Sequence, residues 1–592
     1  MKNEEKLALA FILLLSFSLS AYSVTSLHMR NINSYSELLL AKDAVAGKLS
    51  SPTPLLYQLT AFVYSILNSG STGFNAELML TIAKILPIIF SLLCVALFYF
   101  MLRSMFSEIA AVGGTVLLVS SLPFIMAMGS GFYTADALGM CLFTAACSAF
   151  FLFHKSRNYL LLLASALLFF MSGMSWETGW VMIGVVLLSL LAQLAYSWGK
   201  KFDEPLAHGA AAVLVTFLLA YFIFPQGNVF SDMKTTNLLA YTSSIPLAVV
   251  GIFAFISWLI GKHRRRSEFG VFAASFFILS VVVLLFHYFP AALGIALFSA
   301  FAINELLELK NENLALMLFA GTLFFVSFLF SVNFLDTNQS IIASAGVALT
   351  SVFIASLYRE RRIVVYITFS VIALFLFSSL IAAMISASQR QDIVGSGADE
   401  VISWTADNLP DNATVWAFRV SPLLEFTTGR RGYSNDTEFA RFILSNDSAA
   451  FLKSRNVTHM LVDTSLFDSI GTLKVLANNT RVRIASFIFY GRGMSGGSLY
   501  GIFVSADGEV AYVQLDPITS NPVAGSVRVV TKEGNMRVVP IENFLSAGSG
   551  RLVYPQDNYK VNLFNLFFGQ VGGLKQVYAS SGGDIKIYEV VD

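Results

Sequence analysis

Residues 363–392 read IVVYITFSVIALFLFSSLIAAMISASQRQD, and the chain changes character within this stretch. The part 363–385 carries no charged side chain and is long enough to cross the hydrocarbon of a membrane as one helix. From ISASQRQD onward hydrophobicity falls, and Asn, Asp, Ser and Gly become frequent. The stretch therefore divides the chain into an apolar part, 1–387, and a polar part, 388–592.

Apolar runs of the same kind recur throughout the first part, and each approaches the ~20 residues that a transmembrane helix needs. The composition agrees, because 56% of the 592 residues are hydrophobic and 13% are charged, against about 25% charged in soluble domains. We therefore predict an α-helical polytopic membrane protein. With 363–385 the runs make about thirteen spans: 7–27, 83–102, 109–128, 136–153, 159–174, 178–197, 208–224, 238–260, 269–286, 289–306, 314–331 and 341–357.

Lysine and arginine orient these spans, because cytoplasmic loops are enriched in both residues. With the N-terminus inside, the inner loops hold most of the basic side chains, including the run KHRRR at 262–266. The short outer loops near 129–135 and 287–288 hold none. An odd number of spans then places 388–592 outside. We predict a multi-pass protein of the cell membrane, with a cytoplasmic N-terminus and an extracytoplasmic C-terminal domain.

The polar part reads as a mixed α/β domain. A helical pattern at 397–408 precedes two short buried strands, TVWAFRV at 414–420 and THMLVD at 458–463, which flank a helical stretch at 436–454. Four further strands, a short helix and a closing strand are then expected at 481–491, 498–505, 510–516, 526–532, 562–571 and 584–591. The net charge of +1 gives no reason to expect a nucleic-acid partner.

The long first outer loop, 28–82, has a pattern of its own. It contains NSYSELLLAKDAVAGKLSSPTPLLYQLTAFVYSIL at 33–67, which is a helical pattern, a Gly-Lys stop, a proline turn and a second apolar segment. That second segment is too short to span a membrane easily and is typical of an interfacial helix. A large outer loop of this kind suits an enzyme whose substrate is a lipid.

Five motifs in this order and spacing resemble a known family. They are NSYSELLLAKDAVAGKLSSPTPLLY at 33–57, GSGFYTADAL at 129–138, GMSWETGW at 173–180, EFTTGRRGYSND at 425–436, and NLFFGQVGGLKQVY at 565–578 followed by IKIYEV. The chain resembles the catalytic subunit of oligosaccharyltransferase in its archaeal and bacterial single-subunit form. The resemblance implies the GT-C fold with thirteen spans. It also implies transfer of a glycan from a polyprenyl phosphate or diphosphate carrier onto an asparagine of an acceptor protein.

The charged residues of that family are mostly replaced in this chain. Asn33 stands where the resemblance expects a metal-binding Asp, and Thr134-Ala135-Asp136 stands for Asp-x-Asp. The position of the Trp-Trp-Asp-Tyr-Gly motif holds Ala417 to Ser421, directly after Trp416. Asp136 is left as the candidate ligand for Mn²⁺ or Mg²⁺, and amide oxygen is a poorer ligand than carboxylate for these hard cations. The scaffold is retained while the charged groups of the chemistry change.

Two carboxylates are the candidate catalytic residues, and each has a simpler interpretation. Asp136 opens a predicted helix, where a carboxylate is favoured by the helix dipole alone; the resemblance adds a metal or phosphate role. Glu37 follows Asn33 by one helical turn and is a candidate base, or else part of a solvated helix face.

The candidate substrate-binding residues are Asn33, Thr134, Trp176, Glu177, His287, Arg419 and Arg430. Trp176 is also typical of an aromatic-belt anchor, and Glu177 is expected to line the cavity beside Asp136. His287 is either structural or a phosphate contact. The two arginines either bind an anionic glycan or phosphate or form surface ion pairs.

Three functions remain in competition. The first is a membrane glycosyltransferase with a polyprenyl-phosphate-linked glycan as donor and a protein or glycan as acceptor. The second is a non-catalytic paralogue that binds a lipid-linked glycan or a partner protein. The third is a transporter, which the nearly uncharged spans disfavour.

Overall fold

The structure is a computed structural model in which the chain forms two compact units, Met1–Ile393 and Val394–Asp592. Apart from Gly346, the predicted spans 238–260, 314–331, 341–357 and 363–385 lie outside the described residues. The structure describes residues 3–21, 29, 33–48, 55–69, 73–175, 179–198, 203–223, 270–284, 288–308, 346, 398–445, 449–464, 466, 469–478, 484–495, 498–505, 509–516, 522–532, 534–540, 545–547, 551–555, 562–568, 571–580 and 585–591.

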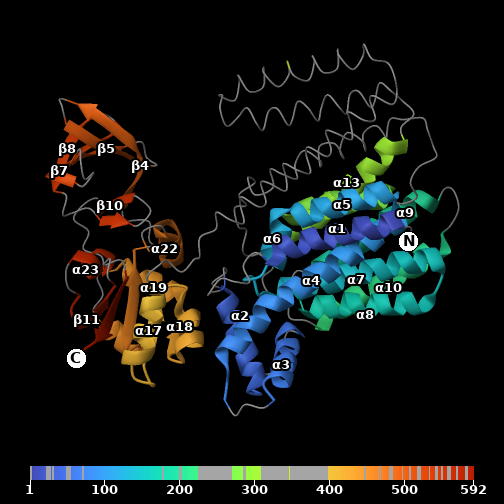
Figure 1. Ribbon diagram of the computed structural model, residues 1–592, viewed down its shortest axis with the longest axis horizontal. Helices are drawn as coiled ribbons and strands as arrows, with labels where there is room; N and C mark the ends of the chain where they lie inside the picture. Colours follow the sequence, from blue (N-terminus) through green and yellow to red (C-terminus); the bar gives the residue numbers. More distant parts are fainter. Residues whose placement is uncertain are drawn as a thin grey trace. The chain divides into compact units, whose positions relative to one another are not determined.

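The first unit is a bundle of apolar helices that lie side by side (Figure 1). Within the described residues, three of them are long and apolar enough to cross a membrane: Ala76–Met105, Ala135–Ser156 and Gly179–Ser197. The bundle helices are α1 (Asn3–Ser20), α4 (Ala76–Met105), α5 (Glu108–Ser120), α6 (Leu122–Met128), α7 (Ala135–Ser156), α8 (Tyr159–Ser175), α9 (Gly179–Trp198), α10 (Glu204–Ile223), α12 (Gly270–Leu284) and α13 (Tyr288–Glu308).

One predicted span is broken in two. The run 109–128 forms α5 and the short α6, which meet at Ser121. Pro123 lies in the first turn of α6 and has no N–H to continue the helix of α5. In the middle of α5, a Cβ added at Gly114 would lie 2.7 Å from Ala300 Cβ, so glycine lets α5 and α13 approach closely.

Two shorter helices come from the long loop predicted between the first two spans. Helix α2 (Asn33–Val45) and helix α3 (Leu55–Leu67) pack against each other beside the beginning of α4 (Figure 1). The Tyr64 hydroxyl of α3 accepts a hydrogen bond of 2.6 Å from the main-chain N–H of Asn75, the residue that caps α4. We call this part of the bundle the α2–α3 end.

The second unit contains two β-sheets. The five-stranded sheet has the order β11-β12-β3-β1-β2, with β3 at its centre. Strand β1 runs parallel to β2 and β3, whereas β12 is antiparallel to β3 and to β11. Its strands are β1 (Thr414–Ala417), β2 (Arg431–Tyr433), β3 (His459–Asp463), β11 (Leu574–Ala579) and β12 (Ile585–Val590). The helices of this part are α17 (Ala398–Asn408), α18 (Ser421–Thr428), α19 (Asp436–Ile443), α20 (Ala450–Ser454), α22 (Ile470–Ala477) and α23 (Asn562–Phe568).

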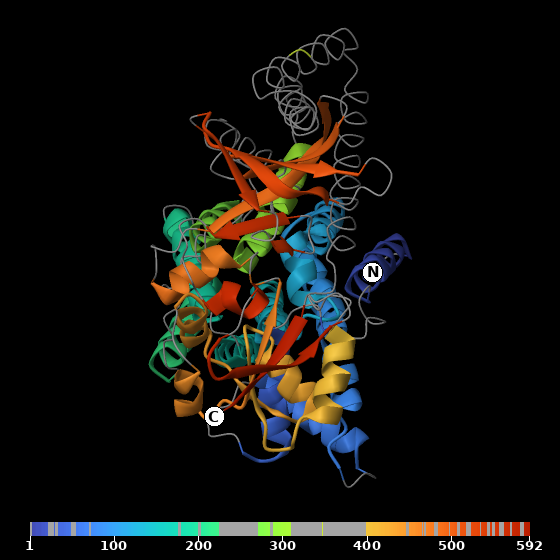
Figure 2. The same cartoon turned by 90° about the vertical axis from the view of Figure 1, so that its left-hand side faces the viewer.

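The second sheet is antiparallel throughout and is inserted between α22 and α23. Its order is β8-β7-β6-β5-β4-β10-β9, and Figure 2 shows its strands as a twisted layer. Phe487, Val513, Val527 and Val529 are buried on one face and form its core. The strands are β4 (Ile484–Ser495), β5 (Ser498–Ser505), β6 (Val510–Leu515), β7 (Pro522–Val530), β8 (Met536–Pro540), β9 (Leu545–Ala547) and β10 (Arg551–Pro555).

Candidate functional site

Tyr133 joins three segments at the α2–α3 end. Its main-chain N–H donates a hydrogen bond of 3.0 Å to Ser34 Oγ in the first turn of α2. Its hydroxyl forms a hydrogen bond of 2.6 Å with Thr60 Oγ1 of α3, in which either hydroxyl can be the donor. Ser34, Thr60 and Tyr133 are all fully buried. These two bonds hold α2 and α3 against the segment that leads into α7.

Glu37 belongs to the same cluster. The Tyr57 hydroxyl of α3 donates a hydrogen bond to the Glu37 carboxylate of α2, so the carboxylate is held from the neighbouring helix. Burial raises the pKa of Tyr133; the hydrogen bond with Thr60 opposes this, and the negative charge of Glu37 adds to it. Tyr133 is therefore neutral at physiological pH, and it lies close enough to Glu37 for the carboxylate charge to affect its pKa.

Asn33, Thr134 and Asp136 flank this cluster. Asn33 precedes Ser34, and Thr134 follows Tyr133, so the Ser34–Tyr133 hydrogen bond brings the two together from positions about a hundred residues apart in the sequence. Thr134 caps α7, although its side chain makes no capping hydrogen bond. Asp136 is half-buried in the first turn of that helix. The structure thus gathers Asn33, Glu37, Thr134 and Asp136 at one end of the bundle.

Three of the predicted site residues lie outside the described residues: Trp176, Glu177 and His287.

The two predicted arginines lie in the second unit. Arg419 is exposed in the turn after β1, and its guanidinium lies 5.0 Å from the centre of the Phe418 ring. Arg430 is mostly buried: its guanidinium pairs with Asp411 and donates to the Ala406 carbonyl at 2.9 Å. Arg430 thereby ties the end of α17 to the segment before β2, while Arg419 presents its charge to solvent.

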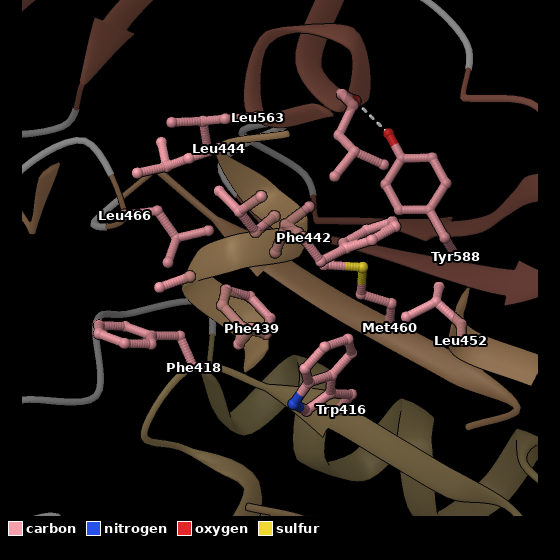
Figure 3. Packing of buried hydrophobic residues seen from close by; sticks show 14 of the residues in the cluster. Trp416, Phe418, Phe439, Phe442, Leu444, Leu452, Met460, Leu466, Leu563 and Tyr588 are labelled. Atoms are coloured by element: carbon pink, nitrogen blue, oxygen red, sulfur yellow. Dashed lines mark hydrogen bonds between the residues drawn. The ribbon is translucent and has the colours of Figure 1, made fainter. Parts of the chain in front are cut away.

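Trp416, next to the position that the resemblance gives to the Trp-Trp-Asp-Tyr-Gly motif, is a core residue. It is 1% exposed, and its ring lies edge-on to Phe439 at 5.2 Å and to Tyr433 at 5.5 Å. Figure 3 shows it among the buried side chains of this cluster, with Phe418 and Phe442. The indole is therefore not available to a substrate.

A divalent metal finds few ligands among the described residues. Glu37 and Asp136 are the carboxylates that the structure brings to the cluster, and within the described ranges no group of three or more His, Cys, Asp or Glu side chains could hold an ion. Mg²⁺ and Mn²⁺ favour several oxygen ligands, with carboxylates among them. The described residues do not fit such an ion.

Several residues of the cluster were not singled out from the sequence. Ser34, Tyr57 and Thr60 belong to the loop 28–82, and Tyr133 belongs to the segment before α7. None of them stands out in the sequence, because only the packing of α2 on α3 and on the start of α7 gives them partners. Lys84 carried a readable signal: it is a lone lysine in the apolar run AKILPIIF, and it is buried in α4. An ionisable side chain inside an apolar membrane helix is a functional candidate by default.

Comparison with known proteins gives a likeness of fold. No protein-family model and no curated protein sequence matches the chain. The crystal structure of the Archaeoglobus fulgidus oligosaccharyltransferase tethered to an acceptor peptide with the NVT sequon has a TM-score of 0.63 and 14% identity, over 98% of this chain and 80% of that one. The apo form of the same protein has a TM-score of 0.61 and 13% sequence identity, with the same coverage of the two chains.

The archaeal oligosaccharyltransferase AglB of A. fulgidus, in complex with an inhibitory peptide and a dolichol-phosphate, gives a TM-score of 0.56 and 13% identity over 98% and 80% of the two chains. These likenesses span both compact units and agree with the predicted fold class. The chain has the GT-C fold of these oligosaccharyltransferase structures: an α-helical polytopic membrane part followed by a C-terminal mixed α/β part with two sheets.

Proposed function

We propose that this protein is a membrane glycosyltransferase that moves a glycan from a polyprenyl-phosphate-linked donor to an acceptor protein at the outer face of the cell membrane. The observation that carries the proposal is the hydrogen bond between Ser34 and Tyr133, because it brings the Glu37 helix to the start of α7, where Asp136 lies. The likeness of fold supports it, since the structure of AglB holds a dolichol-phosphate and an inhibitory peptide.

In this proposal Glu37 is the base. The acceptor nitrogen attacks the anomeric carbon of the first sugar, and its proton passes to the Glu37 carboxylate. The bond between that carbon and the phosphate oxygen breaks, and its electron pair stays on the phosphate. The Tyr57 hydroxyl keeps the carboxylate aimed, which lowers the entropic cost of bringing base and acceptor together. Asp136 accepts a hydrogen bond from the acceptor and orients it.

The α2–α3 end faces outward in this proposal. The opposite end of the bundle holds ion pairs with basic members, Arg103 with Glu5 at 3.0 Å and Arg157 with Asp203 at 3.7 Å. Basic residues at that end are consistent with a cytoplasmic surface. The donor lipid then enters from the outer leaflet, and the polar unit from Val394 onward lies outside.

The second candidate is a non-catalytic relative that binds a lipid-linked glycan or a partner protein without transferring the glycan. The small carboxylate set in the described part of the cluster favours it, because the resemblance associates transfer with a metal held by several carboxylates.

A reconstituted assay separates the two candidates. The full-length protein in liposomes receives a lipid-linked oligosaccharide and a sequon peptide, with and without Mn²⁺, and glycopeptide is measured. The proposal expects product that Glu37→Gln reduces by at least about a hundredfold, the scale of general-base catalysis. Asp136→Asn, which weakens the bond that orients the acceptor, should reduce it about tenfold or more. Glu77→Gln, an exposed carboxylate in the first turn of α4, is the matched control. Saturable lipid binding without any product would favour the non-catalytic relative.

A further inference from the structure

Lys84 is the most deeply buried lysine or arginine among the described residues, with 7% of its surface exposed. It lies in the third turn of α4, an apolar helix long enough to cross a membrane. Burying a charge in such a place costs free energy unless the charge has partners or lines a polar cavity. A buried lysine in such a helix is therefore a functional candidate.

The register between α4 and α7 gives the level of Lys84 in the bundle. Cys94 Sγ lies 3.4 Å from Thr144 Oγ1, and Ser148 Oγ donates to the Leu97 carbonyl at 2.7 Å. Both contacts join a residue of α4 to one of α7 about fifty positions later, so the two helices run parallel in this register. The same register sets Lys84 level with Thr134 and the first turn of α7.

The face of α4 that carries Lys84 also points to the segment before α7. Ser91 follows Lys84 by seven residues, which is two turns on one helix face. Ser91 Oγ lies 2.8 Å from Ser20 Oγ at the end of α1, and the Ser20 carbonyl accepts a hydrogen bond of 2.7 Å from the Ser130 N–H. Lys84 and Ser130 therefore belong to one neighbourhood at the α2–α3 end.

Two hydroxyl groups in the segment before α7 have no hydrogen-bond partner among the described residues. Ser130 is fully buried and its Oγ is unpartnered, and Thr134 Oγ1 is buried and unpartnered as well. Buried hydroxyl groups are rarely left in this state, because each loses its hydrogen bonds to water. They lie at the N-terminus of α7, a helix of 22 residues whose first N–H groups and dipole favour an anion.

We propose that Lys84, Ser130 and Thr134 bind the phosphate of the polyprenyl carrier. The two hydroxyls donate hydrogen bonds to phosphate oxygens, and the Lys84 ammonium balances the negative charge that the phosphate brings next to Glu37 and Asp136. When the bond from the anomeric carbon to the phosphate oxygen breaks, the electron pair stays on that oxygen, and Lys84, still protonated, stabilises it. The inference rests on the proposed function and deepens it by naming the residues that bind the leaving group.

The test measures lipid binding without transfer. The full-length protein in nanodiscs is titrated with a polyprenyl phosphate and with the matching unphosphorylated polyprenol. Wild type is expected to prefer the phosphate, and Lys84→Met to lose that preference. Ser130→Ala and Thr134→Val are each expected to weaken phosphate binding about tenfold, as for loss of one hydrogen bond to a charged group. Lys84→Arg should restore part of the preference, because it keeps the charge.

Two variants serve as matched controls. Lys42→Met removes a lysine of α2 whose ammonium lies over the Phe74 ring at 5.0 Å, and Ser299→Ala removes another buried, unpartnered hydroxyl in α13. Both should bind the phosphate as wild type does. A Lys84→Met protein that folds and keeps the full preference for the phosphate would overturn the proposal. If Lys84→Met does not fold, unchanged affinity in both hydroxyl variants would overturn it instead.

The outcomes also separate this inference from the proposed function. Phosphate preference that depends on Lys84, in a protein that makes no glycopeptide, would support the inference and contradict the transferase. If the protein forms glycopeptide and substitution of all three residues leaves phosphate binding unchanged, the transferase would be supported and the inference contradicted.

Discussion

The main-chain N–H of Tyr133 and the side-chain oxygen of Ser34 lie 3.0 Å apart and form a buried hydrogen bond between segments 99 residues apart in the sequence. Ser34→Ala leaves that N–H without a partner, which costs about 1–3 kcal/mol. We expect α2 to loosen, Glu37 to lose its position and glycopeptide formation to fall about tenfold or more. Ser36→Ala, an exposed serine of the same helix, should leave both stability and product unchanged. Equal product from the two variants would contradict the role given to this bond.

The hydroxyl of Tyr57 holds the Glu37 carboxylate. Tyr57→Phe keeps the ring and removes that donor, so we expect kcat to fall about tenfold, while the protein remains folded. Tyr64→Phe is the matched control on α3, because its hydroxyl contacts the main chain of Asn75 and no carboxylate. That variant should cost stability at the start of α4 and little activity. The measurements are the thermal midpoint and the kcat of both variants. A kcat that is equal in Tyr57→Phe and Tyr64→Phe would contradict the role given to the Tyr57 hydroxyl.

Arg419 occupies a strained turn. Its φ is +60°, and the Val420 N–H donates to the Phe418 carbonyl at 2.7 Å, which closes a γ-turn around it. Glycine adopts this conformation without strain, so we expect Arg419→Gly to change the unfolding free energy by no more than about 1 kcal/mol. If the exposed guanidinium binds an anionic group of the substrate, KM for that substrate rises severalfold. Arg431→Gly, at an exposed arginine in β2, controls for general loss of charge.

Trp416 is predicted to act through packing alone. Trp416→Ala empties a site lined by Phe439, Phe442 and Phe451, and such a change costs about 3–5 kcal/mol. Trp404→Ala should cost less, because Trp404 is only partly buried and packs against Tyr578. Chemical denaturation of the full-length protein, followed through probes in the second unit, measures both changes. A Trp416 variant of normal stability with altered acceptor choice would contradict the core assignment.

His459 gives the second unit a pH dependence of known sign. Burial lowers the pKa of this imidazole, and Glu589, its neighbour across the β3–β12 pairing, partly opposes the shift. The unfolded state, with a pKa of about 6.5, therefore binds the proton first as the pH falls. The stabilising contribution is complete above about pH 6.5 and is lost progressively below it. After correction for the intrinsic exchange rate, the β3 amides should become less protected from hydrogen exchange as the pH falls from 7 to 5. The loss of protection should be smaller in His459→Gln.

Much of the fold could be predicted because it depends on patterns of short range. The helical pattern at 397–408 is α17 within one residue, and the runs SLYGIFVS and VAYVQLD are β5 and β6. Strands such as β2 could not be predicted in this way. It is three residues long with an exposed arginine, and only its parallel pairing with β1 makes it a strand.

The candidate site was predictable in part. Glu37, Asn33, Thr134 and Asp136 came from a resemblance of motifs, and the structure places them at one end of the bundle. The bonds that assemble the cluster could not be foreseen, because Ser34, Thr60 and Tyr133 are about a hundred residues apart at most and carry no sequence signal of their own. Lys84 could have been predicted from the sequence. A single lysine changes the mean hydropathy of an apolar run very little, so a search for membrane spans does not single it out.

The place of the seven-stranded sheet within the chain has a consequence for how the second unit is made. The segment from β4 to β10 can pair with itself as soon as it is synthesised, whereas β3 must wait for β12, with Asp463 opposite Ile585. The later sheet can therefore form before the earlier one is complete. Until then the apolar edge of β3 stays open, and pairing over such a long separation is slow. This interval is when a nascent chain is most exposed to wrong strand partners.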